Sequence, residues 1–139
     1  MRKERVELTP IGRVESPLTE PASAPKQGDE GAPAAWLVIT VDLLAGLDGI
    51  VAGDDILVFT WLHRARREAL TVHPRGDASR PPQGVFNTRS PDRPNPIGLH
   101  RVQVVEVDDN RLQVRGLEAI DGTPILDLKP VLSTNVSER

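Results

Sequence analysis

The stretch HRVQVVEVDDNRLQVRGL, residues 100–117, decides the fold. Apolar and polar side chains alternate from Arg111 to Leu117, and from His100 to Val107 with one interruption at Val104-Val105. Between these segments lies Asp108-Asp109-Asn110, which is a typical turn sequence. Alternation with a period of two is typical of strands with one buried face, so this stretch predicts a β-hairpin.

Shorter signals predict further strands on both sides of the hairpin. A turn at Asp121-Gly122 leads into Ile125–Leu128, where apolar and polar residues alternate again. Asp55–His63 is almost continuously apolar, as expected of a strand buried on both faces. The remaining predicted strands are Leu8–Glu15 and Trp36–Val41. Many short strands without a βαβ alternation indicate an all-β barrel or sandwich.

The other segments are predicted to be mostly loops. Only Asp42–Leu47 predicts helix, a single turn with Asp42 as its N-cap. Ser16–Pro33 is rich in proline and glycine, and Arg64–Gln83 in proline, glycine and arginine, so both are expected to be loops. Residues 131–139 are expected to form a flexible tail. A length of 139 residues fits one domain spanning residues 1–139.

Charge is distributed unevenly along the chain. The formal net charge of −3 is unusual for a protein that binds nucleic acid. Between Trp61 and Arg101, however, eight arginines and no lysine stand against three acidic residues. Guanidinium groups bind carboxylates and phosphates in a bidentate manner, so this composition favours recognition of such an anion.

Composition and missing motifs exclude several classes of site. The absence of cysteine excludes disulfides, thiolate catalysis and cysteine-ligated metals. His63, His73 and His100 lie far apart without suitably spaced carboxylates, so no metal is expected. No glycine-rich phosphate loop follows a predicted strand, and no strand-to-helix nucleophile turn is present, although composition alone leaves Ser-His-Asp chemistry open. No secretion signal or membrane span is recognised, which predicts a cytoplasmic protein.

Three segments have unusual sequences. Residues 84–99, GVFNTRSPDRPNPIGL, contain three prolines within six residues, together with arginines and asparagine. Such a stiff loop is either a preorganised binding site or a tight structural loop with exposed arginines. Residues 121–130, DGTPILDLKP, and residues 24–28, APKQG, would be ordinary turn and linker sequences on their own.

Together these segments resemble the TsaA-like (TrmO) family of S-adenosylmethionine-dependent tRNA methyltransferases. The resemblance covers almost the whole chain, from Ile11 to Pro130. Its matching segments are Pro10-Ile11-Gly12 with Ser16-Pro17, Pro25-Lys26-Gln27, the predicted strand ending at His63, TRSPDRPNPIGL at 88–99, and DGTPILDLKP at 121–130. The last two blocks in combination are highly specific.

The resemblance implies a fold, a cofactor and an assembly. The expected fold is mainly β, a small antiparallel β-barrel with long Pro/Arg-rich loops and little helix. The expected cofactor is S-adenosyl-L-methionine, bound near the interface of a homodimer. The implied cofactor-binding residues are Pro25, Lys26, Gln27, His63, Arg64, Arg89, Leu99, Asp121, Gly122, Thr123 and Pro124.

The residue types fit the groups of this cofactor. Arg89 can bind its carboxylate, and Asp121 can accept hydrogen bonds from its ammonium or ribose hydroxyls. Leu99 and Ile97 can form an apolar wall for adenine. No residue is identified as a catalytic acid or base.

The substrate implied by the resemblance is tRNA. In the characterised tRNA enzymes of the family, the methyl group goes to N6 of threonylcarbamoyladenosine beside the anticodon. This chain departs from the family pattern at Lys26, Asp92, His100 and Val131. Two alternatives are therefore kept: a methyltransferase acting on a small molecule, and a regulator that binds the cofactor without catalysis.

Overall fold

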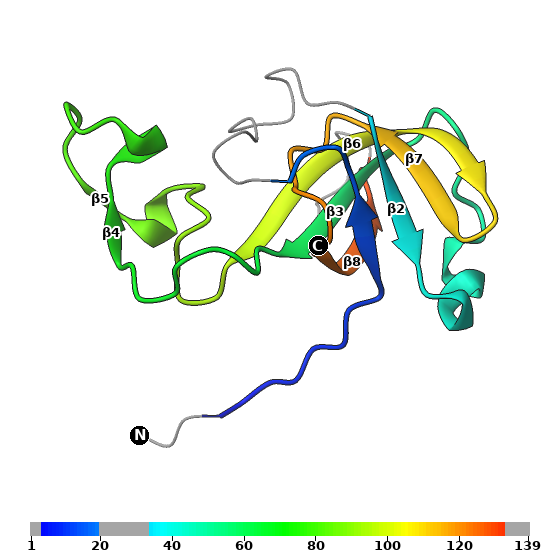
Figure 1. Ribbon diagram of the computed structural model, residues 1–139, viewed down its shortest axis with the longest axis horizontal. Coiled ribbons are helices and arrows are strands. Elements are labelled where there is room, and N and C mark those ends of the chain that lie inside the picture. Colours follow the sequence, from blue (N-terminus) through cyan, green and yellow to red (C-terminus); the bar gives the residue numbers. More distant parts are fainter. Residues whose placement is uncertain (1–3, 20–33, 133–139) are drawn as a thin grey trace.

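Six antiparallel strands form a closed β-barrel (Figure 1). The computed structural model describes residues 4–19 and 34–132. Around the barrel the strands follow the order β1-β2-β7-β6-β3-β8, with β8 pairing back onto β1. Their bounds are Gly12–Glu15 (β1), Ala35–Ile39 (β2), Asp55–Trp61 (β3), Ile97–Asp108 (β6), Arg111–Arg115 (β7) and Pro124–Pro130 (β8). The expectation of a mainly β, antiparallel barrel is confirmed.

The hairpin predicted from residues 100–117 is formed by β6 and β7. Asp108 pairs with Arg111, and the turn between them places Asp109 at φ 55°. Aspartate tolerates this left-handed conformation better than most residues. β6 begins at Ile97, three residues earlier than predicted, because the end of the Pro-rich segment already pairs with β3.

The interior of the barrel is filled with aliphatic side chains. Leu37, Val58, Leu112, Val114 and Ile125 have no exposed surface. They occupy alternate positions of their strands, as the period of two requires. Because aromatic residues are few, the core relies on branched aliphatic packing.

The two tryptophans lie on the outside of the strands. Trp36 and Trp61 are both half-buried. The guanidinium carbon of Arg111 lies 4.9 Å from the ring centroid of Trp36, and that of Arg67 lies 5.1 Å from the ring centroid of Trp61. Such cation–π contacts cover the rings without burying them in the core.

Some predicted boundaries were wrong. The predicted strand Leu8–Glu15 is reduced to Gly12–Glu15, because Pro10 has no N–H group for a ladder hydrogen bond. The predicted helical turn is a 3-10 helix, η2 (Val41–Leu47), whose N-cap is Thr40 and not Asp42. The backbone N–H of Thr40 donates to the carbonyl of Ile11, which fixes the start of the helix and places Asp42 in its first turn.

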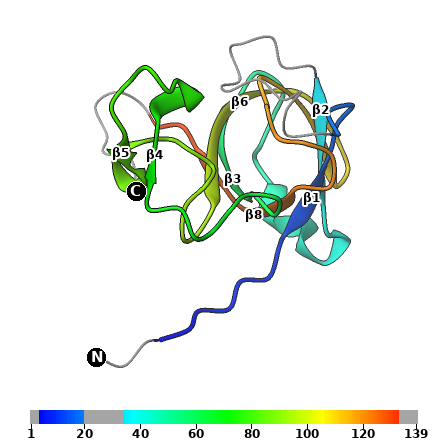
Figure 2. The same cartoon turned by 60° about the vertical axis from the view of Figure 1, so that its left-hand side comes forward.

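The predicted loop Arg64–Gln83 contains regular structure. β4 (Thr71–Val72) pairs with β5 (Gln83–Gly84), and two 3-10 helices, η3 (Pro74–Gly76) and η4 (Val85–Asn87), accompany them. Residues 64–96, which include these elements, form a lobe beside the barrel, between the end of β3 and the start of β6 (Figures 1 and 2).

Candidate functional site

The antiparallel register brings several of the predicted site segments to one end of the barrel. Gly12 pairs with Ile125, Thr60 pairs with Ile125, and Trp61 pairs with Ile97. The ends of β1 and β3 therefore lie beside the starts of β6 and β8. We call this end the rim and define it as residues 16–19, 62–64, 96–99 and 116–124.

The turn before β8 is anchored to the chain that follows β1. Gly122 has φ 81°, a conformation that favours glycine, and its N–H donates to the carbonyl of Val14 at 2.8 Å. The backbone N–H of Ser16 donates to Oδ1 of Asp121 at 3.0 Å. Thr123 is buried, and its hydroxyl donates to the carbonyl of Ile120 at 2.7 Å. Asp121 itself is exposed, so its carboxylate retains acceptor capacity at the surface of the rim.

Arg64 joins the end of β3 to the same segment. Its guanidinium donates to the carbonyl of Thr19 at 3.0 Å. His63 is exposed beside it. Arg64 and Asp121 therefore both bind residues 16–19, which lie five residues before the predicted Pro25-Lys26-Gln27 segment in the sequence. Pro25, Lys26 and Gln27 lie outside the described residues.

Leu99 lies at the rim on the outer face of the barrel. It pairs with Phe59 across β6 and β3, and 43% of its surface is exposed. Ile97, two residues earlier on the same face, is similarly exposed. Both residues can therefore contact a ligand outside the barrel wall, and neither faces the core.

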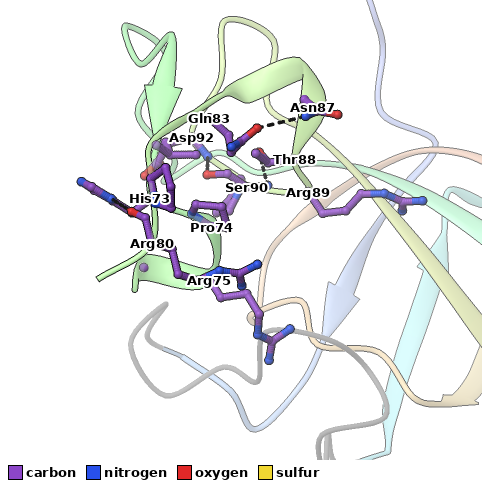
Figure 3. A pocket seen from close by; sticks show the side chains of 14 residues that line it. His73, Pro74, Arg75, Arg80, Gln83, Asn87, Thr88, Arg89, Ser90 and Asp92 are labelled. Carbon is purple, nitrogen blue, oxygen red and sulfur yellow. Dashed lines mark hydrogen bonds between the residues drawn. The ribbon is translucent and has the colours of Figure 1, made fainter. Parts of the chain in front are cut away.

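Arg89 reaches toward the barrel from the lobe. Its backbone lies at the wall of a lobe pocket, and its side chain extends out of that pocket toward the barrel (Figure 3). Arg89 is exposed, and within the described residues no hydrogen bond or ion pair joins it to Asp121. The structure thus links Arg64 and the Asp121 turn through residues 16–19, whereas Arg89 approaches separately.

The Pro-rich segment uses one of its two arginines for its own structure. The guanidinium of Arg93 donates to the carbonyls of Val85, Ser90 and Thr88 at 2.9, 2.8 and 3.2 Å. The Asn95 side chain accepts a hydrogen bond from Arg67 at 3.1 Å. The prediction of a binding loop therefore applies to Arg89, while Arg93 holds the loop together.

Three side chains inside the barrel form a chain of hydrogen bonds that the sequence did not predict. Nε2 of His100 lies 2.7 Å from Oγ1 of Thr60, and Nδ1 of His100 lies 2.5 Å from Oε1 of Glu118. A Cβ atom at Gly98 would overlap Thr60 and His100, so the site is tightly packed. The order of groups is that of a hydroxyl–imidazole–carboxylate triad. Thr60, however, has no exposed surface, so a substrate cannot reach its hydroxyl, and the arrangement is structural.

Among the residues that the structure describes, no group of three or more His, Cys, Asp or Glu side chains could hold a metal ion. No helix within residues 4–19 and 34–132 is long and apolar enough to cross a membrane.

Comparisons with known proteins give one consistent family. Residues 13–135 match the model of the tRNA-methyltransferase O N-terminal domain. A "Probable S-adenosyl-L-methionine-binding protein" of Methanothermobacter thermautotrophicus is 41% identical over 94% of this chain and 93% of its own length. An "S-adenosyl-L-methionine-binding protein" of Archaeoglobus fulgidus is 43% identical over 88% of this chain and 86% of its own length.

Solved structures agree with the sequence comparisons. A crystal structure of TrmO from Pseudomonas aeruginosa superposes with a TM-score of 0.75 at 27% identity, covering 94% of this chain and 56% of that one. A second TrmO structure gives a TM-score of 0.75 over 100% of this chain and 62% of that one. This chain thus spans roughly three fifths of the length of those proteins. The family match and the shared fold together establish that this chain belongs to the tRNA-methyltransferase O N-terminal domain family.

Proposed function

We propose that the protein is an S-adenosyl-L-methionine-dependent methyltransferase whose cofactor binds at the rim. The observation that carries the proposal is the convergence of Arg64 and the Asp121 turn on residues 16–19. These segments are distant in sequence, and they belong to or border the segments on which the family resemblance rests. Relatives with 41% and 43% identity are named as proteins that bind this cofactor.

The side chains at the rim, together with Arg89 of the lobe, fit the chemical groups of S-adenosylmethionine. The exposed guanidinium of Arg89 can bind the carboxylate of the methionine moiety. The free acceptor positions of Asp121 can bind the ammonium group or the ribose hydroxyls. Leu99 and Ile97 provide an apolar surface for the adenine ring. His63, Gly122, Thr123 and Pro124 complete the proposed set, together with Pro25, Lys26 and Gln27.

Positioning is the main contribution that this protein can make to methyl transfer. The bound cofactor supplies an electrophilic methyl group on its sulfonium. The rigid Asp121 turn and the Pro-stiffened loop of Arg89 can hold the reactants in line and exclude water. Proximity and orientation of this kind can supply roughly 7–11 kcal/mol of the barrier. Since Thr60 and His100 are buried inside the barrel, they are not assigned as acid or base.

The proposed methyl acceptor is tRNA, at N6 of threonylcarbamoyladenosine next to the anticodon. The family is described as a tRNA methyltransferase domain, and the lobe carries the excess of arginine expected for a polyanionic substrate. Such a role would place the protein in the cytoplasm. Mass spectrometry of tRNA nucleosides from a strain lacking this protein tests the assignment. Loss of the methylated nucleoside, restored by the intact gene, is expected.

Two other outcomes of that experiment separate the alternatives. Unchanged tRNA nucleosides, combined with turnover of the cofactor on a metabolite extract, would indicate a methyltransferase of small molecules. Unchanged nucleosides with cofactor binding but no turnover would indicate a regulator.

The proposed assembly is a homodimer with the cofactor near the subunit interface. Ile97 and Leu99 leave 45% and 43% of their surfaces exposed at the start of β6, and Val105 leaves 37% exposed farther along the same outer face, beyond the exposed polar residues Arg101 and Gln103. An outer face that carries exposed apolar side chains at both of its ends can be buried against a second copy. A partner on this face would also cover Leu99 and enclose a ligand at the rim, which favours transfer in a dry site.

A further inference from the structure

We propose that the ring of Phe86 is a stacking surface for an unpaired nucleobase of the RNA substrate. Phe86 belongs to η4 in the lobe, and 80% of its surface is exposed. The inference rests on the tRNA methyltransferase function proposed above and adds to it a residue that recognises the substrate. An aromatic ring can stack on any base of single-stranded RNA, because every base has a π-face.

Phe86 is the most open of the four aromatic residues in the chain, all of which the structure describes. The two tryptophans are half-buried, and each has an arginine guanidinium over its ring. Phe59 is also half-buried, on the outer face of β3. These three rings are part of the barrel wall. The ring of Phe86 contributes almost nothing to packing within the chain, so it is available to a ligand.

The backbone that carries this ring is held firmly. Val85, the residue before Phe86, is only 1% exposed, and its N–H donates to the carbonyl of Leu70 at 3.0 Å. The carbonyl of Val85 accepts the N–H and the hydroxyl of Thr88 at 3.1 and 3.0 Å, and the guanidinium of Arg93 at 2.9 Å. A ring on a backbone fixed in this way loses little conformational entropy when a base stacks on it.

The surroundings of Phe86 suit a nucleic acid better than an apolar protein segment. Residues 64–96 contain seven arginines and three acidic residues, with paired and unpaired side chains counted alike. A positive balance attracts a phosphate backbone, while an aromatic ring holds one base. A protein-docking surface would be a larger apolar patch, but Leu70 is the only other large apolar side chain exposed within residues 64–96.

The position of Phe86 in the sequence relates it to the proposed cofactor site. Phe86 and Arg89 are three residues apart, so their Cα atoms lie within about 11 Å of each other. Arg89 is the residue proposed to bind the cofactor carboxylate. A base that turns out of its stack to reach the methyl group leaves its neighbours without a stacking partner, which costs free energy. A phenyl ring on the segment that anchors the cofactor can replace that partner.

The test measures the affinity of tRNA that contains threonylcarbamoyladenosine for the wild type and four single variants of the intact chain. Phe86→Ala should lose about fivefold to a hundredfold in affinity. Phe86→Leu should lose affinity as well, because an aliphatic side chain has no π-face. Phe86→Trp keeps an aromatic ring and should stay within about twofold of the wild type. The matched control Leu70→Ala removes an exposed apolar side chain of the same lobe and should also stay within about twofold.

Further measurements separate stacking from a structural role. The slope of log affinity against log salt concentration should be the same for all variants, because none of them removes a charge. The melting temperature should match that of the wild type, since the ring lies outside the core. S-adenosylmethionine affinity should also match, since Phe86 is not in the proposed cofactor set.

Each contrary result has a distinct meaning. If Phe86→Ala binds tRNA as tightly as the wild type, the stacking role is overturned and the tRNA substrate stands. If Phe86→Leu binds like the wild type while Phe86→Ala does not, the contact is apolar and stacking is again overturned. If Phe86→Ala weakens self-association of the protein without RNA, the ring is a subunit contact and the proposal is wrong. If the wild type binds the cofactor but no tRNA, the stacking role and the tRNA substrate are both overturned.

Discussion

At the scale of single residues, the most specific prediction concerns the role of Arg89 in cofactor binding. Its guanidinium is exposed in a loop stiffened by proline, and it points toward the barrel (Figure 3). If it binds the carboxylate of S-adenosylmethionine, Arg89→Ala should weaken cofactor binding by about 1.5–3 kcal/mol. Arg66→Ala and Arg75→Ala should change it by less than about 0.5 kcal/mol, since neither belongs to the proposed cofactor set. Calorimetric titration of the three variants checks this, and equal losses in all of them would show that the roles are misassigned.

The buried chain of Thr60, His100 and Glu118 predicts a specific pattern of stability. His100→Leu removes the partner of two polar groups at once and should lower the free energy of unfolding by about 2–4 kcal/mol. Thr60→Val in the same protein should recover part of that loss, because the double variant no longer buries a lone hydroxyl. Urea denaturation of both single variants and the double variant measures the coupling. Strictly additive losses would contradict the account.

At the scale of elements, the lobe depends on Arg93 more than on its small apolar interior. Among the aliphatic and aromatic side chains of the lobe that the structure describes, only Val85 is buried. Leu70 and Phe86 are largely exposed. Removing three guanidinium hydrogen bonds by Arg93→Ala should destabilise the lobe locally by about 2–4 kcal/mol. Arg93→Lys should not restore the stability of the lobe, because one ammonium group cannot donate the same three hydrogen bonds as the planar guanidinium.

Hydrogen exchange distinguishes this local effect from global unfolding. Amides of residues 84–93 should exchange faster in Arg93→Ala, while the barrel strands keep their protection because their core is separate. Arg66→Ala is the matched control, since its exposed ion pair with Glu68 contributes little. Uniformly faster exchange throughout the barrel would show that the lobe and the barrel unfold together.

At the scale of elements, the sequence predicted the long strands of the barrel but not the short strands of the lobe or the contacts that depend on strand register. The β6–β7 hairpin was predicted because two long β-type segments flank a turn sequence. The alternation is interrupted only at Val104-Val105, where the register of β6 against β7 shifts. β4 and β5 were missed because two-residue strands leave no periodic signal. The cofactor set came from the family resemblance. That His63, Arg64, Leu99 and residues 121–124 lie at one rim depends on the pairing of β1, β3, β6 and β8. The contact of His100 with Thr60 was missed for the same reason, since it depends on the register of β3 against β6.

At the scale of the whole molecule, assembly through the outer face of β6 is the main expectation. Val105→Asp adds a charge to the outer face of β6 and should shift a dimer toward monomer, with a rise in the dissociation constant of about tenfold or more. Val51→Asp is a suitable control, because Val51 is also exposed but lies in the turn that precedes β3. Sedimentation velocity at several concentrations measures the effect. A wild type that stays monomeric with full cofactor affinity would refute the shared site.

The central claim is that the rim binds S-adenosyl-L-methionine, and one calorimetric titration tests it most directly. The cofactor is titrated into the folded wild type and into Asp121→Ala, whose turn keeps the glycine that its geometry requires. The account predicts one binding event per chain for the wild type and an affinity at least about tenfold lower for Asp121→Ala. A folded wild type that shows no binding, or an Asp121→Ala variant that binds as tightly as the wild type, would contradict the site proposed here.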